Sequence, residues 1–178
     1  MLARLQGFGR ARRGTATVEF ALVMPMLLVV YLGGIAASQA VSTWRKVCDT
    51  TSQVTNVIDQ FTSAQASDVQ GVMTAAAQIM YPFSTSSLKE VITEVSVNSS
   101  GSATVTWSQA YNGGVALAKG AAVTLPSSLA QPNATVMWVQ ASYAYTPVAG
   151  ITFFPTVTMN QQLYGIPRSS SSIPCSNC

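Results

Sequence analysis

The feature that most constrains the fold is a long segment without any charged side chain, from Phe20 to Trp44. Its most apolar part, Phe20–Ala37, would span roughly 27 Å as a helix, close to the roughly 30 Å hydrocarbon core of a bilayer. The segment therefore predicts a helix that can cross a membrane. Pro25 lies inside it and removes one helical hydrogen bond, so we expect a bend there.

Charge is distributed unevenly around this apolar segment. Only Arg45 and Lys46 follow it closely, whereas four arginines precede it: Arg4, Arg10, Arg12 and Arg13. The positive-inside rule then places the N-terminus in the cytoplasm and the bulk of the chain across the membrane. From Thr15 onward there are five basic and six acidic residues, so this part is near neutral and indicates no nucleic-acid surface.

Two simpler interpretations of the apolar segment stay open. A secretory signal has an apolar region of about 7–15 residues and then a small-residue cleavage site, which Ala36-Ala37-Ser38 could mimic. An uncleaved signal anchor needs only the basic residues and the apolar run. Neither explains why a carboxylate, Glu19, stands at the entrance to the run, because an ionised acid near hydrocarbon costs about 2.5 kcal/mol or more.

Glu19 is part of a longer motif. The chain reads Arg-Arg-Gly, then Thr-Ala-Thr-Val-Glu-Phe, then Ala-Leu-Val-Met-Pro before the aliphatic residues. Over residues 10–40 it resembles the N-terminus of TadE-like pseudopilins, which are minor subunits of the tight-adherence (Tad/Flp) branch of type IV pili. Phe20 after the glutamate matches these minor subunits, whereas the major pilins of the family usually carry tyrosine there.

The resemblance implies processing and a function. In that family a membrane prepilin peptidase removes a short basic leader after a glycine, which here would be residues 1–14, cut between Gly14 and Thr15. Residues 15–40 would then form the transmembrane helix, and residues 41–178 a periplasmic domain with a Ser-rich C-terminal tail. The protein would be a minor pilin that takes part in Tad pilus assembly as a priming, tip or membrane-held subunit.

The resemblance also implies the surroundings of the protein. Its partners would be inner-membrane lipid, the prepilin peptidase, other pilin and pseudopilin subunits and the pilus assembly platform. It would lie in the bacterial inner membrane or in surface pili, with the arginines Arg10, Arg12 and Arg13 keeping the leader in the cytoplasm. The alternative is an uncleaved, membrane-anchored scaffold or binding protein outside the cytoplasm.

Cleavage would give Glu19 a physical role. The new N-terminus at Thr15 carries a positive charge at neutral pH, and in a bundle of apolar helices it needs a counter-ion. A Glu19 carboxylate from a neighbouring subunit could supply it and set the axial register, with Phe20 beside it, although the pair adds little net stability. The simpler interpretation is that Glu19 lies among headgroups and water.

Catalysis is not indicated by the composition. The chain has no histidine, the commonest acid–base group and metal ligand, and only 8% charged residues. No Ser–His pair, paired carboxylates or phosphate-binding loop is recognisable, and Glu90 and Glu94 are expected to face solvent along one strand. We therefore expect no enzyme, no cofactor, no metal site and no small-molecule substrate.

Helical spacing continues beyond the apolar segment, at steps of three and four: Val41, Trp44, Cys48, Thr51, Val54, Ile58 and Phe61. The pattern predicts one helix from Thr17 to Phe61, with two helices hinged near Gly33-Gly34 as the alternative. A second helix should begin at the capping box Ser67–Gln70, bury one stripe (Val69, Val72, Met73, Ala76 and Met80), and stop at Pro82, giving an antiparallel helical hairpin.

Alternation replaces helical spacing after Pro82. It predicts a β-hairpin around the turn Asn98–Gly101, a short strand near 121–125, a helical turn at 126–130, the longest strand over 137–145, and an edge strand near 153–159. The fold class expected is α+β, a single-pass protein whose helical hairpin packs on four or five antiparallel strands. We expect the aromatic residues to serve mainly in packing, with contact to subunits or carbohydrate as the alternative: Trp107, Trp138, Tyr143, Tyr145, Phe153 and Phe154.

The three cysteines are Cys48, Cys175 and Cys178. A redox-active pair needs a helix N-terminus to lower the thiol pKa, which a serine-rich tail does not supply, and a zinc site needs further ligands. A structural disulfide fits an oxidising compartment best. Cys175 would bond Cys178, which we favour, or one of them would bond Cys48.

Overall fold

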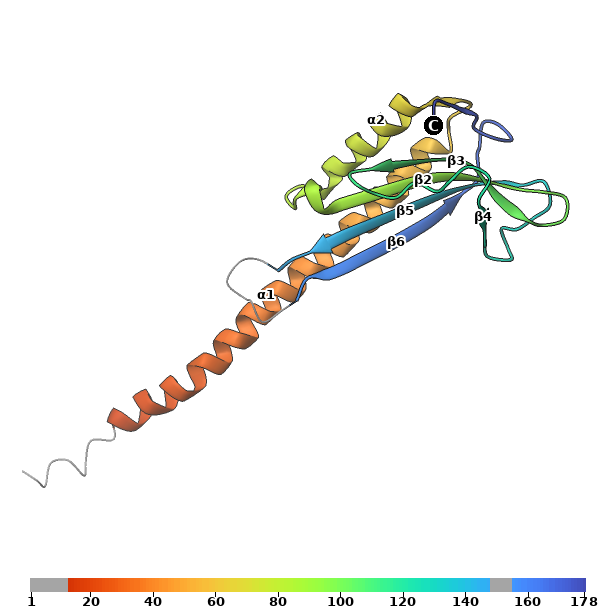
Figure 1. Ribbon diagram of the computed structural model, residues 1–178. Helices are drawn as coiled ribbons and strands as arrows, with labels where there is room; N and C mark the ends of the chain where they lie inside the picture. Colours follow the sequence, from red (N-terminus) through yellow and green to blue (C-terminus); the bar gives the residue numbers. More distant parts are fainter. Residues whose placement is uncertain (1–12, 148–154) are drawn as a thin grey trace, which may run out of the picture.

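The computed structural model describes residues 13–147 and 155–178, and its longest element is helix α1, Arg13–Ile58. This helix of 46 residues runs without interruption through Pro25 and through Gly33 and Gly34. Figure 1 shows that its N-terminal half projects from the rest of the protein, whereas its C-terminal half lies against the sheet. The prediction of one continuous helix is therefore confirmed, and the hinged alternative is wrong.

The buried face of α1 differs from the predicted one. Thr51, Val54 and Ile58 are buried as expected, but Val41 and Trp44 are exposed. The buried face also contains residues outside the predicted stripe: Thr43, Thr50 and Thr55, together with Val47. Each of the four threonine hydroxyls donates to the carbonyl four residues earlier, at 2.8–2.9 Å. A threonine satisfied by its own helix packs as a small apolar residue, which hydrophobicity patterns overlook.

Helix α2, Ala66–Ala77, runs back beside the end of α1 and completes the predicted helical hairpin (Figure 1). Its cap lies earlier than predicted, because the Gln65 N–H donates to the Asp68 carboxylate at 3.0 Å, whereas Ser67 was expected to cap the helix. A short 3-10 helix, η2 (Gln78–Met80), follows before Pro82. The expected stripe is buried except for Val72, which is half-buried.

The strand-rich half forms one five-stranded antiparallel sheet in the order β4-β3-β2-β5-β6. Its strands are β2 (Leu88–Val97), β3 (Ala103–Tyr111), β4 (Ala122–Val123), β5 (Thr135–Tyr145) and β6 (Val157–Gly165). A second 3-10 helix, η3 (Thr85–Ser87), precedes β2. Helix α1 contacts β5 and β6, and α2 contacts β3, so both helices cover the same face of the sheet. The α+β fold class is confirmed, with β6 at the edge that Pro155 indicated.

The β2–β3 hairpin closes through the predicted turn. The Asn98 side-chain oxygen accepts hydrogen bonds from the N–H groups of Ser100 and Ser102, and Gly101 adopts a positive φ of 83°. A register shift follows Glu94, so that Glu94 pairs with Trp107 but Val95 pairs with Val105. The shift turns Trp107 toward the helices and Val105 toward the opposite face, although simple alternation had placed both on one face.

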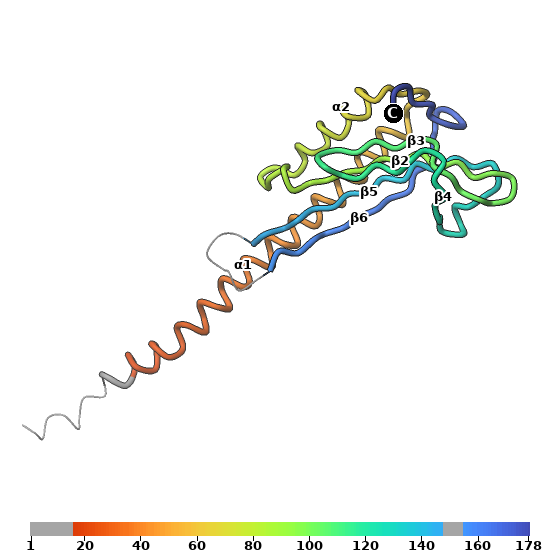
Figure 2. Tube along the Cα trace, in the orientation of Figure 1, coloured from red at the N-terminus to blue at the C-terminus, as the bar shows by residue number. Residues whose placement is uncertain are grey.

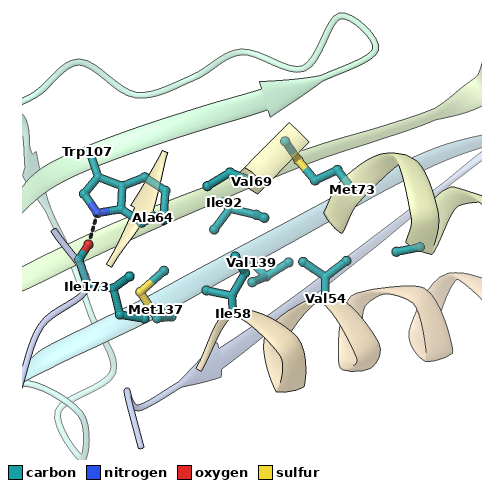
Figure 3. Packing of buried hydrophobic residues seen from close by; sticks show 11 residues of the cluster. Val54, Ile58, Ala64, Val69, Met73, Ile92, Trp107, Met137, Val139 and Ile173 are labelled. Carbon is teal, nitrogen blue, oxygen red and sulfur yellow. Dashed lines mark hydrogen bonds between the residues drawn. The ribbon is translucent and has the colours of Figure 1, made fainter. Parts of the chain in front are cut away.

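The main core lies between this sheet and the two helices. Figure 3 shows Ile58 and Val54 of α1, Val69 and Met73 of α2, and strand residues such as Ile92 meeting in one cluster. A second cluster fills the end of the domain nearer the projecting helix, around Val47, Met80 and Leu88. The opposite face of the sheet has its own smaller cluster under residues 123–130.

The chain returns to this core through a C-terminal strap, residues 166–178. The side chain of Ile173 is fully buried in the main cluster, and its carbonyl accepts a hydrogen bond of 2.8 Å from the Trp107 indole (Figure 3). Strand β7 (Cys175–Ser176) then pairs in parallel with β1 (Ala64–Gln65), the short strand between the two helices. Figure 2 shows the strap at the end of the domain opposite to the projecting helix.

We predict that the Ile173→Ala substitution lowers the free energy of unfolding by about 2–4 kcal/mol, because it opens a cavity in the main core. Urea denaturation of the full chain in mild detergent would measure the change. The matched control is Ile166→Ala in the same strap, where 63% of the side chain is exposed and a change within about 0.5 kcal/mol is expected. Equal effects at the two positions would show that the strap does not close the core.

Candidate functional site

The projecting half of α1 is apolar on every side. Every residue from 16 to 32 is exposed, and the large apolar residues among them follow one another around the helix without a polar face. Ala16–Ile58 has the length and composition of a membrane span, and almost none of its most apolar stretch is buried. A helix that is hydrophobic all round and unburied needs lipid or other apolar helices around it, which supports membrane anchoring.

The residues predicted for processing and register lie at the free end of this helix. The backbone of Arg13, Gly14 and Thr15 forms the first turn of α1, whereas Arg10 and Arg12 lie outside the described residues. Glu19 and Phe20 are both exposed, and Phe20 exposes 62% of its side chain. Among the residues that the structure describes, Glu19 therefore has no contact that would bury its carboxylate. Its assembly role remains a prediction.

The helix joins the folded domain near Ala36. The Tyr145 hydroxyl at the end of β5 donates to the Ala36 carbonyl at 3.4 Å, and Ala40 packs against the second core cluster. Nearly two turns beyond Ala40, the Lys46 ammonium donates to the Ile79 carbonyl at 2.9 Å and so connects α1 to η2. These contacts make the end of the exposed helix part of the domain.

Three of the six acidic side chains are buried, contrary to the prediction for two of them. Glu90 and Glu94 on β2 are 0% and 1% exposed, and Asp59 after α1 is 2% exposed. The expectation that Glu90 and Glu94 face solvent is wrong, because β2 lies in the middle of the sheet and both of its faces are covered. Alternation alone cannot identify a solvent face on such a strand.

The buried carboxylates have few partners. Both oxygens of Glu90 lack a hydrogen bond within the described residues, and burial raises the pKa of Glu90 to about 7. Glu94 accepts from the Ile173 N–H at 2.6 Å, while its second oxygen is buried and unpaired in the described chain. Burial raises the pKa of Glu94, and the hydrogen bond from the Ile173 N–H opposes this rise. Glu94 thus binds the C-terminal strap.

Asp59 lies against the backbone of Gly165 at the end of β6. A Cβ atom built on Gly165 would lie 2.7 Å from the Asp59 carboxyl carbon, so the site needs glycine. The Asp59 carbonyl accepts from the Arg168 N–H at 2.7 Å. Burial raises the pKa of Asp59 to about 6, although the Arg168 guanidinium lowers it. Glu94 therefore holds the strap through its carboxylate, and Asp59 holds it through its backbone carbonyl.

The structure joins Cys175 and Cys178 in a disulfide within the strap, and Cys48 on α1 is a half-buried free thiol. Within the described ranges no group of three or more cysteine, aspartate or glutamate side chains could hold a metal ion. No sequence pattern indicated that these acids are buried, except that Glu90 and Glu94 lie on a strand with several apolar residues.

Three of the six aromatic residues singled out in the sequence are buried in the interior. Trp107, Tyr143 and Tyr145 are buried on the helix side of the sheet. Trp138 lies on the other face and stacks on Tyr164, with ring centroids 5.8 Å apart. Phe153 and Phe154 lie outside the described residues. The described aromatic residues thus support the packing interpretation.

We predict that Glu90 makes the domain less stable as the pH rises. Its folded-state pKa of about 7 exceeds the ordinary value of 4.5, so the folded state holds the proton longer and stability falls from pH 5 to pH 8. The Glu90→Gln substitution should reduce this pH-dependent decrease in the free energy of unfolding by about 2 kcal/mol. Denaturant unfolding at both pH values measures it, with the exposed Asp49→Asn as control. An unchanged pH dependence in Glu90→Gln would contradict the prediction.

Comparison with known proteins finds a family whose model is similar to the N-terminal helix. Residues 14–55 match the model of the TadE-like protein family. Neither the curated proteins nor the solved structures include a match to the chain. The match begins at Gly14, covers Glu19 and the exposed apolar residues, and extends into the part of α1 that packs on the sheet. The resemblance is confirmed: this chain carries a TadE-like N-terminal region and is consistent with a pilin-type protein of the Tad system.

Proposed function

We propose that this protein is a minor pilin, or pseudopilin, that takes part in assembly of a Tad-type pilus after processing by a prepilin peptidase. The TadE-like match supports a pilus-related role, and the pilus proteins of that family are structural. The observation that carries the proposal is the continuity of α1. One helix is apolar and exposed at one end and is part of the domain core at the other.

In this proposal the projecting helix serves two environments in turn. It holds the subunit in the inner membrane, with the N-terminus in the cytoplasm and the domain in the periplasm, and later packs among the helices of other subunits. Both environments are apolar, so the exposed side chains of residues 16–32 suit each of them. The assembly platform would move the subunit from the first environment to the second.

Glu19 would act at the second stage. Removal of residues 1–14 leaves the Thr15 ammonium at the end of the helix, where burial among apolar helices is costly without a counter-ion. An exposed Glu19 is free to meet that ammonium on a neighbouring subunit. The pair would fix the axial position of one helix against the next.

We predict that the mature protein begins Thr-Ala-Thr-Val-Glu and that Gly14→Trp blocks processing, because a large side chain would fill the position next to the cleaved bond. N-terminal sequencing of the membrane-extracted protein tests both statements, with Gly9→Trp in the same leader as the matched control. A start at Met1 would instead identify an uncleaved anchor. A start near Ser38 would identify a secretory signal.

We predict that Glu19→Ala lowers incorporation into pili at least about tenfold, since an unpaired buried charge costs about 3–5 kcal/mol. Quantitative immunoblotting of sheared pili against the membrane fraction measures the ratio. Thr17→Ala, also exposed and in the same turn of α1, should leave it unchanged. Undiminished incorporation of Glu19→Ala would exclude the pairing role.

A further inference from the structure

The two edges of the five-stranded sheet differ. On the β3 side, β4 pairs with Ala103 and Thr104, and the segment 112–121 covers the rest of the strand. Four hydrogen bonds join this cover to β3. Two of them involve Val105, whose carbonyl accepts from the Gly120 N–H at 2.8 Å and whose N–H donates to the Ala121 carbonyl at 2.9 Å. The other two run from the Leu117 N–H to the Ser108 hydroxyl at 3.1 Å and from the Gly114 N–H to the Tyr111 carbonyl at 3.0 Å. This edge offers little backbone to another strand.

The β6 edge is open by comparison. Nine consecutive residue pairs join β6 to β5 without a register shift, so β6 is a regular strand along its whole length. Among residues 13–147 and 155–178, no backbone hydrogen bond joins β6 to any segment other than β5. Since alternate residues of a strand point their N–H and C=O groups to opposite sides, half of the β6 backbone groups point away from the sheet.

Strand β6 also lacks the devices that usually protect an edge. Its sequence, Val-Thr-Met-Asn-Gln-Gln-Leu-Tyr-Gly, contains no lysine, no other charged residue and no proline. Natural edge strands are normally short, charged, kinked by a bulge or covered, because an open edge pairs with other chains. Within the described residues one edge of the sheet is thus covered and the other is unprotected, and an unprotected edge is able to pair with another chain.

We propose that the β6 edge binds an extended, uncharged segment of another polypeptide, which adds a sixth strand to the sheet. Only an extended backbone presents alternating N–H and C=O groups at the spacing of this edge. The exposed side chains of Asn160 and Gln162 would contact polar side chains of the added strand on the face away from the helices. This inference does not depend on the pilus function proposed above.

A second copy of the chain is a poor occupant for this edge. Strand β6 and helix α1 run in the same direction, away from the projecting end (Figure 1). Antiparallel pairing of two β6 strands would therefore point the two projecting helices in opposite directions, which one membrane does not allow. If two β6 strands paired in parallel about a two-fold axis, each residue would lie directly opposite the same residue of the other copy. In a parallel ladder, however, a residue bonds to the two residues on either side of the one opposite to it, so this symmetric arrangement cannot form the ladder. A symmetric pair of β6 strands is therefore excluded, and the proposed partner is a different polypeptide.

The first test uses adjacent proline substitutions, Gln161→Pro and Gln162→Pro, in the full-length chain. Neighbouring N–H groups point to opposite sides, so one substitution removes a bond to β5 and the other removes only an outward N–H. We expect one variant to melt at a clearly lower temperature and the other to stay within about 3 °C of the parent. Lowered melting temperatures for both variants would show that the N–H groups on both sides of β6 are already hydrogen bonded in the folded chain, and would overturn the proposal.

The second test identifies the partner in cells that produce the full-length protein. A photo-crosslinking amino acid replaces Asn160 on the edge or Ser142, its register partner on the inner strand β5. We expect at least about fivefold more crosslinking at Asn160, to one peptide segment that mass spectrometry identifies in another polypeptide, and loss of that product in the proline variant that keeps its melting temperature. Equal yields at both positions, crosslinks only to a second copy, or insensitivity to proline would overturn the proposal.

Discussion

The packing of α1 on the sheet is the interaction on which the rest of the structure depends. The C-terminal half of this helix contributes Val47, Val54 and Ile58 to the core, and its threonines hydrogen bond to their own helix so that they can be buried. Because the helix is continuous, the same packing also determines the direction in which the exposed apolar half projects from the domain. There is therefore no break in the helix between the exposed apolar half and the folded domain. The TadE-like match extends across this junction.

Much of this architecture could be predicted from local sequence patterns. The long helix, the second helix, the β2–β3 hairpin and the edge position of the last strand follow from apolar spacing, from Asn98 and Gly101, and from Pro155. The full buried face of α1 could not be predicted, because threonine counts as polar in a hydrophobicity pattern, whereas the buried threonines of this helix pack as small apolar residues. The register shift after Glu94 was equally hidden, since it depends on how two strands meet and not on either strand alone.

The buried carboxyl groups show a further limit of sequence patterns. Glu90, Glu94 and Asp59 come from two separate parts of the chain, and only the folded topology covers them with α1, α2 and the C-terminal strap. Two of the three also hold that strap, through the Glu94 carboxylate and the Asp59 carbonyl. Burial raises the pKa values of these three groups. Their contribution to the free energy of unfolding therefore depends on pH, whereas that of the apolar core around them does not.

The Tyr145–Ala36 contact has a geometric consequence for any assembly of such subunits. An α-helix advances about 1.5 Å and turns about 100° with each residue. The number of residues between Glu19 and Ala36 therefore determines both the distance of the domain from the N-terminal end of the helix and the rotation of β6 about the helix axis. One inserted residue would move the domain by only about 1.5 Å along the axis, but it would rotate the open edge by about 100°.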